Sequence, residues 1–132
     1  MNKKQAHLEM IQGVINRLST NSFSLKGWTV ALVSALFVLA GQNQNVYFAI
    51  LAYFPAISLW VLDAYFLWQE RLFRGLFDHV RGLKEDEIDF SMNTSIIKDQ
   101  ISPWYAVILS KTLLIFHGVI LGSIIVVMFF LI

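Results

Sequence analysis

Residues 27–62 read GWTVALVSALFVLAGQNQNVYFAILAYFPAISLWVL, and none of these 36 residues carries a charge. A helix needs about 20 apolar residues to cross the roughly 30 Å hydrocarbon core of a bilayer. The stretch is therefore too long for one crossing and slightly short for two. Its centre, residues 41–45, reads GQNQN, which is typical of a tight turn. We predict a helical hairpin, with helices over residues 22–40 and 46–67.

Three residues give this hairpin further features. Pro55 lies inside the second predicted helix and predicts a kink, which membrane helices tolerate when neighbours satisfy the freed carbonyl. At the start of the first helix, we expect Lys26 to extend its ammonium group toward the lipid headgroups. Trp28 beside it is a typical interfacial anchor.

A second uncharged run of 21 residues, from Thr112 to Ile132, predicts a third span of about 32 Å. Trp104 and Tyr105 precede it as an interfacial lead-in. The fold expected is an all-α membrane protein with three transmembrane helices. Its predicted parts are an amphipathic helix, a transmembrane hairpin, a cytoplasmic helix with an acidic loop, and a third transmembrane helix with its lead-in, over residues 1–20, 21–67, 68–103 and 104–132.

The overall composition agrees with a lipid environment. Of 132 residues, 57% are hydrophobic and 14% are charged, whereas about 25% are charged in an ordinary soluble domain. The bilayer is therefore the first expected partner. The absence of cysteine excludes disulfides and thiolate metal sites, and a net charge of +1 argues against binding to nucleic acid.

The positions of the basic residues predict an orientation. All ten lie outside the two uncharged runs, and the predicted turn over residues 41–45 has none. Cytoplasmic loops are enriched in Lys and Arg, and three crossings place the two termini on opposite sides. We therefore expect the N-terminus inside and the C-terminus outside.

The first cytoplasmic segment carries an apolar stripe. Leu8, Ile11, Ile15 and Leu18 recur at helical spacing, which predicts an amphipathic helix. This helix could lie on the membrane surface or form a coiled-coil-like seam, and Leu8, Ile11 and Ile15 are candidates for an oligomer interface. Residues 20–22, which read TNS, predict a break before the first span, with a cap for it.

The second span is expected to continue into the cytoplasm as one long helix. Glu70 with Arg74 and Asp78 with Arg81 are spaced as ion pairs on one helix. Such pairs usually belong to a solvated face. The alternative is that Arg71, Arg74 and Arg81 bind a cytosolic protein. Residues 84–89, which read KEDEID, predict an acidic loop.

No catalytic motif occurs in the sequence. It has no phosphate-binding glycine loop and no HExxH, and its histidines, His7, His79 and His117, fall on separate elements. We therefore expect no enzymatic activity, no metal site and no cofactor.

Polar groups at membrane depth are the remaining candidates for activity. Asp63 lies near the cytoplasmic end of the second span, Lys111 starts the third, and His117 lies about 9 Å deeper than Lys111. In one interpretation Asp63 pairs with Lys111 near the headgroups, and His117 bonds a neighbouring helix. In the other, Asp63 and His117 line a water-filled ion pathway.

Gly118 and Gly122 form a GxxxG pattern on the third span. This spacing lets two membrane helices approach closely. Because three helices enclose little space, we expect a homo-oligomer with the third span or the N-terminal helix at its interface.

Three stretches carry a resemblance. Residues 21–28 (NSFSLKGW), 62–67 (LDAYFL) and 70–74 (ERLFR) resemble small bacterial multi-helix membrane proteins. They are also similar to the two-transmembrane effectors of anti-phage defence operons, from which the third span departs. The resemblance implies a bacterial inner-membrane effector that oligomerises and perturbs the membrane. The alternatives are a non-catalytic scaffold that recruits a cytosolic partner and a small transporter, which the lack of an internal repeat disfavours.

Overall fold

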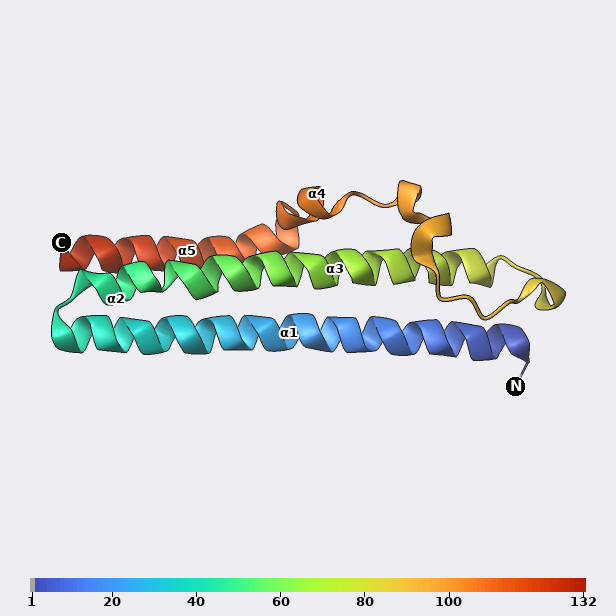
Figure 1. Ribbon diagram of the computed structural model, residues 1–132, viewed down its shortest axis with the longest axis horizontal. Coiled ribbons are helices and arrows are strands. Elements are labelled where there is room, and N and C mark those ends of the chain that lie inside the picture. The colour runs from blue at the N-terminus through green and yellow to red at the C-terminus, as the bar shows by residue number, and fades with distance from the viewer. Residues whose placement is uncertain (1) are drawn as a thin grey trace.

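The computed structural model describes residues 2–132, which are helical with no β-strand. The α-helices are α1 (Lys3–Asn43), α2 (Val46–Leu51), α3 (Tyr53–Arg81), α4 (Trp104–Ile108) and α5 (Lys111–Leu131). Short 3-10 helices occupy Glu85–Glu87, Thr94–Ile96 and Lys98–Gln100. Helix α1 lies antiparallel to α2 and α3, which together follow it along the whole molecule, and α5 lies beside α2 and α3 over about half of that length (Figure 1).

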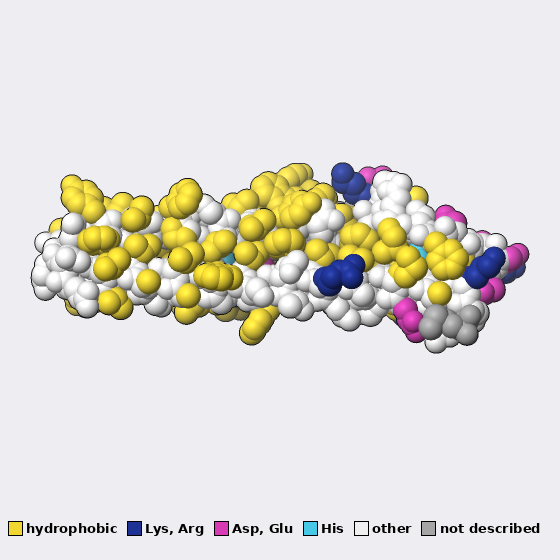
Figure 2. Space-filling model, turned by 60° about the horizontal axis from the view of Figure 1, so that its bottom comes forward, with side chains coloured by type: hydrophobic (Ala, Val, Ile, Leu, Met, Phe, Trp, Pro, Cys, Tyr) yellow, Lys and Arg dark blue, Asp and Glu magenta, His cyan; other side chains and the backbone are white. Residues whose placement is uncertain are grey.

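Three helical stretches are long and apolar enough to cross a membrane, which confirms the expected number. They are Lys3–Asn43, Val46–Arg81 and Lys111–Leu131. The molecule has an apolar half, residues 27–62 and 112–132, and a charged half, residues 2–21 and 68–103. Figure 2 shows the Lys and Arg side chains only from the middle of the molecule toward the charged end. The two termini lie at opposite ends (Figure 1).

The expected break at residues 20–22 is wrong, because α1 continues through them without interruption. Ser and Asn favour helix caps when no packing opposes them. Here α1 buries residues on both sides of this position, Ile15 before it and Val33 after it, against the span formed by α2 and α3, so packing keeps the helix intact. Its length of 41 residues corresponds to about 62 Å, roughly twice the hydrocarbon core.

The apolar stripe of α1 packs against another helix of the same chain. Ile11 and Ile15 are 0% and 2% exposed and pack against Leu72, Leu76 and Val80 of α3. Leu8 is half-buried against the same cluster. Ile11 and Ile15 are therefore not available for the oligomer interface expected from the sequence, because a stripe of the same helical period on α3 covers them. Leu8 keeps part of its side chain at the surface, so its assignment to an interface stays a prediction.

The hairpin turn is shorter than the sequence predicts. Helix α1 extends to Asn43, so only Gln44 and Asn45 lie between the helices. Gln44 adopts a left-handed conformation with φ of 51° and ends α1. The Asn45 side chain accepts a hydrogen bond from the Tyr47 N–H at 3.0 Å and caps α2.

Pro55 interrupts the second span as expected. Proline has no N–H to donate to the carbonyl of Leu51, and its ring crowds that carbonyl. The span therefore divides at Ala52 into α2 and α3, and α3 then continues unbroken from the apolar half into the charged half.

Residues 82–103, the return segment, fold back over the charged half. Ile97 is 2% exposed in the core formed by α1 and α3. The Glu85 carboxylate accepts hydrogen bonds from the backbone N–H groups of Lys3 and Lys4, at 2.6 and 3.1 Å. An anion there satisfies free N–H groups at the start of α1. The acidic loop is thus one anchor of the return segment.

Candidate functional site

A buried carboxylate joins the three long helices where the apolar and charged halves meet. Asp63 of α3 is 0% exposed. Lys26 of α1 places its Nζ 2.7 Å from Asp63 Oδ2, and His117 of α5 places its Nε2 2.8 Å from the same oxygen. Ser22 of α1 donates a hydrogen bond to Asp63 Oδ1. We call these four residues the Asp63 cluster.

Local sequence explains how α1 contributes two members. Ser22 and Lys26 are four residues apart, so they lie on one face of α1, one turn from each other. Lys26 Nζ donates to Ser22 Oγ at 2.9 Å while Ser22 donates to Asp63. The Lys26 side chain thus extends along the surface of α1, and its ammonium group contacts both the Asp63 carboxylate and the Ser22 hydroxyl.

Aromatic side chains fix the histidine. The Trp60 ring stacks on His117 with centroids 5.7 Å apart and an interplanar angle of 7°, and Phe116 meets it edge-on at 5.0 Å. Trp60 also donates its indole N–H to the carbonyl of Ile108 at 3.1 Å. This bond ties the residues just before α5 to α3, one turn from Asp63, and so sets the position of His117.

Most polar side-chain atoms of the Asp63 cluster have a hydrogen-bond or ion-pair partner. A buried carboxylate without partners is very costly, and Asp63 has two nitrogen atoms and a hydroxyl around it. Because His117 Nε2 faces a carboxylate, it carries the proton and donates. His117 Nδ1 is buried and has no hydrogen-bond partner among the described residues.

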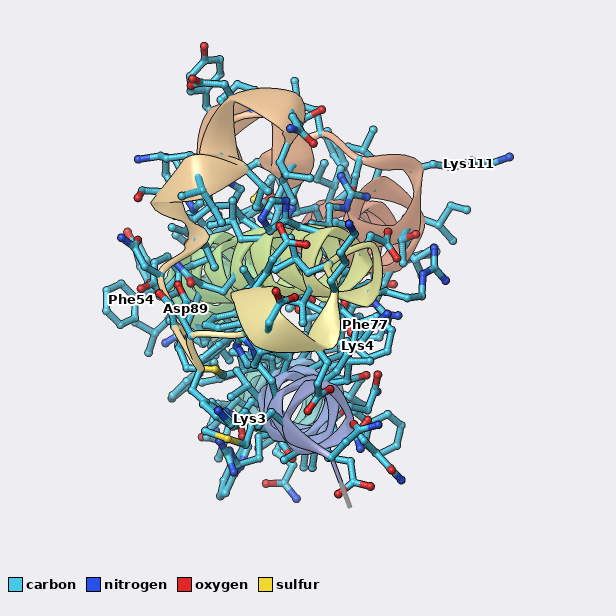
Figure 3. All side chains as sticks on the ribbon, turned by 90° about the vertical axis from the view of Figure 1, so that its right-hand side faces the viewer. Lys3, Lys4, Phe54, Phe77, Asp89 and Lys111 are labelled. Carbon is cyan, nitrogen blue, oxygen red and sulfur yellow. The ribbon has the colours of Figure 1, made fainter. Side chains whose placement is uncertain are left out.

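Lys111 does not join Asp63, contrary to the pairing considered from the sequence. Leu113 and His117, four residues apart, turn toward the bundle, so the register of α5 leaves Lys111 exposed at its first turn. Figure 3 shows the Lys111 side chain pointing away from the other helices. Sequence reasoning assigned Lys26 to the headgroups only. The sequence did contain a sign of the Lys26–Asp63 ion pair, because Ser22 and Lys26 lie one helical turn apart at the same level of the hairpin as Asp63.

Gly118 and Gly122 stay free of intramolecular contacts. A Cβ atom built on either would meet nothing within 4 Å. Ile125 and Phe129, which follow Gly118 and Gly122 on the same face at helical spacing, are 43% and 69% exposed, so this side of α5 faces away from the bundle.

The arginine candidates lie in the charged half, remote from the Asp63 cluster. Arg74 pairs with Glu70 at 3.2 Å and Arg81 with Asp78 at 3.4 Å, as the spacing predicts. Both guanidinium groups are more than half exposed, so these pairs contribute little to stability. Arg71 is half-buried.

Both carboxylate oxygens of Asp63 are already bonded, Oδ1 to Ser22 and Oδ2 to Lys26 and His117, so these groups separate only when the helices move apart. Among residues 2–132, no three His, Asp or Glu side chains are arranged to hold a metal ion. Comparison of the chain with models of protein families, with curated proteins and with solved structures found no match.

Proposed function

We propose that the chain is a non-enzymatic protein of a bacterial inner membrane, with its N-terminus in the cytoplasm and its C-terminus outside. The distribution of charge supports this orientation. Eight of the ten basic residues belong to the charged half, and the other two, Lys26 and Lys111, stand at its boundary with the apolar half. The turn at Gln44–Asn45 and the end of α5 carry none, as the enrichment of Lys and Arg in cytoplasmic segments requires.

Within this membrane, the proposed role is that of a homo-oligomeric effector that forms a pore or otherwise perturbs the bilayer under the control of its cytoplasmic half. The observation that carries the proposal is the Asp63 cluster. It brings together a carboxylate, an ammonium group and an imidazole beside the apolar half that we assign to the membrane, and such groups within a membrane are costly and usually serve a function. The resemblance to anti-phage effectors agrees with this role.

The three long helices of a single chain pack against one another in the apolar half. The apolar half is filled by a core of Val33, Ala52, Ala56 and Ile124, all of them 3% exposed or less. A pore therefore requires several copies of the chain. The open face of α5 at Gly118 and Gly122 supports close approach of a second copy.

The continuous helices offer a means of control. Helices α1 and α3 both extend without a break from the Asp63 cluster into the charged half. A partner that moves the charged ends of these helices also moves Ser22 and Lys26 relative to Asp63. The paired arrangement is then the closed state, and separation of the pair exposes charged groups to water between the copies.

Expression in bacteria tests the proposal. Asp63→Asn removes the charge that holds Lys26 and His117, so the variant should depolarise the membrane and arrest growth without a trigger. Asp78→Asn is the matched control, because Asp78 is an exposed carboxylate on the same helix. A potential-sensitive dye reports the effect, and immunoblots of the membrane fraction establish equal insertion. Inserted Asp63→Asn protein that leaves the potential unchanged contradicts the effector function.

A scaffold function is the second candidate, and one observation favours it. The charged half has a hollow of about 410 Å³ between α1 and α3, lined by Leu8, Gln12 and Phe77 among others. Half-buried apolar side chains bordered by polar ones suit a cytosolic protein partner. Under this candidate, Phe77→Asp abolishes co-purification of a specific protein, while Asp63→Asn leaves the membrane potential intact.

A further inference from the structure

A groove runs along the apolar half between α1 and α5. Both helices pack against the α2–α3 span, which leaves a space of about 720 Å³ where their surfaces diverge. Lys26 and Lys111 stand at one end with Thr112, and the lining is otherwise apolar, including Val30 and Val119.

The order of residues along the groove matches the layers of a bilayer. Helices α1 and α5 are both antiparallel to α3, so Lys26 and Lys111 begin the groove at the boundary with the charged half. Ile115 and Val119 follow one and two turns deeper. From Lys111 to Ile120 the helix rises about 13.5 Å, close to the depth of one leaflet, which is half of a roughly 30 Å core.

The charges at the mouth of the groove favour an anion. Lys26 is compensated by Asp63, with its Nζ also 5.9 Å from the Phe116 ring centroid, and its two hydrogen bonds leave one of its three N–H donors. Lys111 has no ion-pair partner within residues 2–132. No Asp or Glu lines the groove, so one uncompensated positive charge stands at its mouth.

We propose that this groove binds one anionic phospholipid of the cytoplasmic leaflet. The phosphate lies between the Lys26 and Lys111 ammonium groups, with the Thr112 hydroxyl as a further donor. One acyl chain then lies along Val30, Ile115 and Val119. Basic pockets between membrane helices on the cytoplasmic side recognise anionic headgroups in this way. The proposal holds whether or not the oligomer forms a pore.

Native mass spectrometry of the full chain, released from detergent containing phosphatidylglycerol or phosphatidylcholine, tests the site. We expect one phosphatidylglycerol bound in preference to phosphatidylcholine, and an affinity about fivefold lower in Lys111→Gln. Lys84→Gln removes the same charge from the return segment and should bind as the wild type does. Equal losses in both variants, or equal binding of the two lipids, would overturn the proposal.

Two further experiments distinguish a groove that binds a whole lipid from a site that binds only an anion. Val119→Trp fills the groove and should displace the lipid, while Val126→Trp, at an exposed position of α5 outside it, should not. Glycerol phosphate has the headgroup charge without acyl chains and should not compete at equal concentration. Effective competition by glycerol phosphate, or retention of the lipid by Val119→Trp, would also overturn the proposal.

Discussion

The carboxylate of Asp63 is fully buried, and its partners come from two different helices. Lys26 and Ser22 reach it from α1 and His117 from α5. Breaking a buried pair by removing one partner is more harmful than its net strength suggests, because the other charge stays buried without compensation. At the scale of single residues, the structure thus makes Lys26 important and Lys111 dispensable for stability.

We predict that Lys26→Met lowers the free energy of unfolding by about 2 kcal/mol, below the usual range for a fully buried pair because the Lys26 side chain is 23% exposed. Thermal unfolding in detergent, followed by circular dichroism, measures the change. The double variant Lys26→Met with Asp63→Asn should recover part of the loss, since the unpaired charge is gone.

Lys111→Met is the control for this prediction and should change the free energy by less than about 0.5 kcal/mol. If Lys111→Met is as harmful as Lys26→Met, the pairing of Asp63 is not the one described.

At the scale of elements, charge-free runs predicted the spans well. Residue 46 was expected to begin the second helix, and Val46 begins α2. The continuity of α1 through residues 20–22 escaped prediction, because local capping propensity gave way to packing on α3. The partner of Asp63 escaped it too. Lys26 pairs with Asp63 because α1 turns Ser22 and Lys26 toward α3. Lys111 does not pair with it because of the rotation of α5 about its axis, which an almost uniformly apolar helix does not reveal.

The return segment is held against α3 at Gly75. A Cβ atom on Gly75 would lie 2.9 Å from Ile97 Cδ1 and 3.3 Å from Ile101 Cδ1. Gly75→Val should therefore loosen residues 82–103, and hydrogen exchange in that segment should become faster. Gly13→Val is the control, because a Cβ on Gly13 meets nothing within 4 Å. Unchanged exchange in Gly75→Val would show that Ile97 does not anchor the segment.

The open face of α5 gives a second prediction for elements. Gly118→Ile adds a side chain without an intramolecular clash, so unfolding of the monomer should change little. In the proposed homo-oligomer, the added side chain keeps two copies of α5 apart, so cross-linking in nanodiscs should yield far less oligomer. Gly27→Ile on α1, equally free of contacts, should still form it. Normal oligomers from Gly118→Ile would place the interface elsewhere.

At the scale of the whole molecule, the account requires one orientation in the membrane. The chain has no cysteine, so single cysteines report topology directly. Gln44→Cys in the hairpin turn should react with a membrane-impermeant maleimide added to spheroplasts. Asp86→Cys in the return segment should react only after permeabilisation. The reverse pattern would invert the orientation, and labelling of both from outside would refute three spans.

The charged half, the Asp63 cluster and the apolar half form one continuous assembly of helices. Under the proposed function, the pairing of Asp63 with Lys26 should therefore decide whether an oligomer of the chain lets ions cross the bilayer. All three long helices contribute side chains to this cluster, so its contacts depend on how these helices pack together.

Ion flux from liposomes reconstituted with the purified chain tests this central claim most directly. Wild-type protein should leave the vesicles sealed, with its Asp63 cluster intact. Asp63→Asn protein should release potassium at a rate that rises more steeply than linearly with protein per vesicle, because several copies form each path. Sealed vesicles at every density of correctly inserted Asp63→Asn protein would contradict the account.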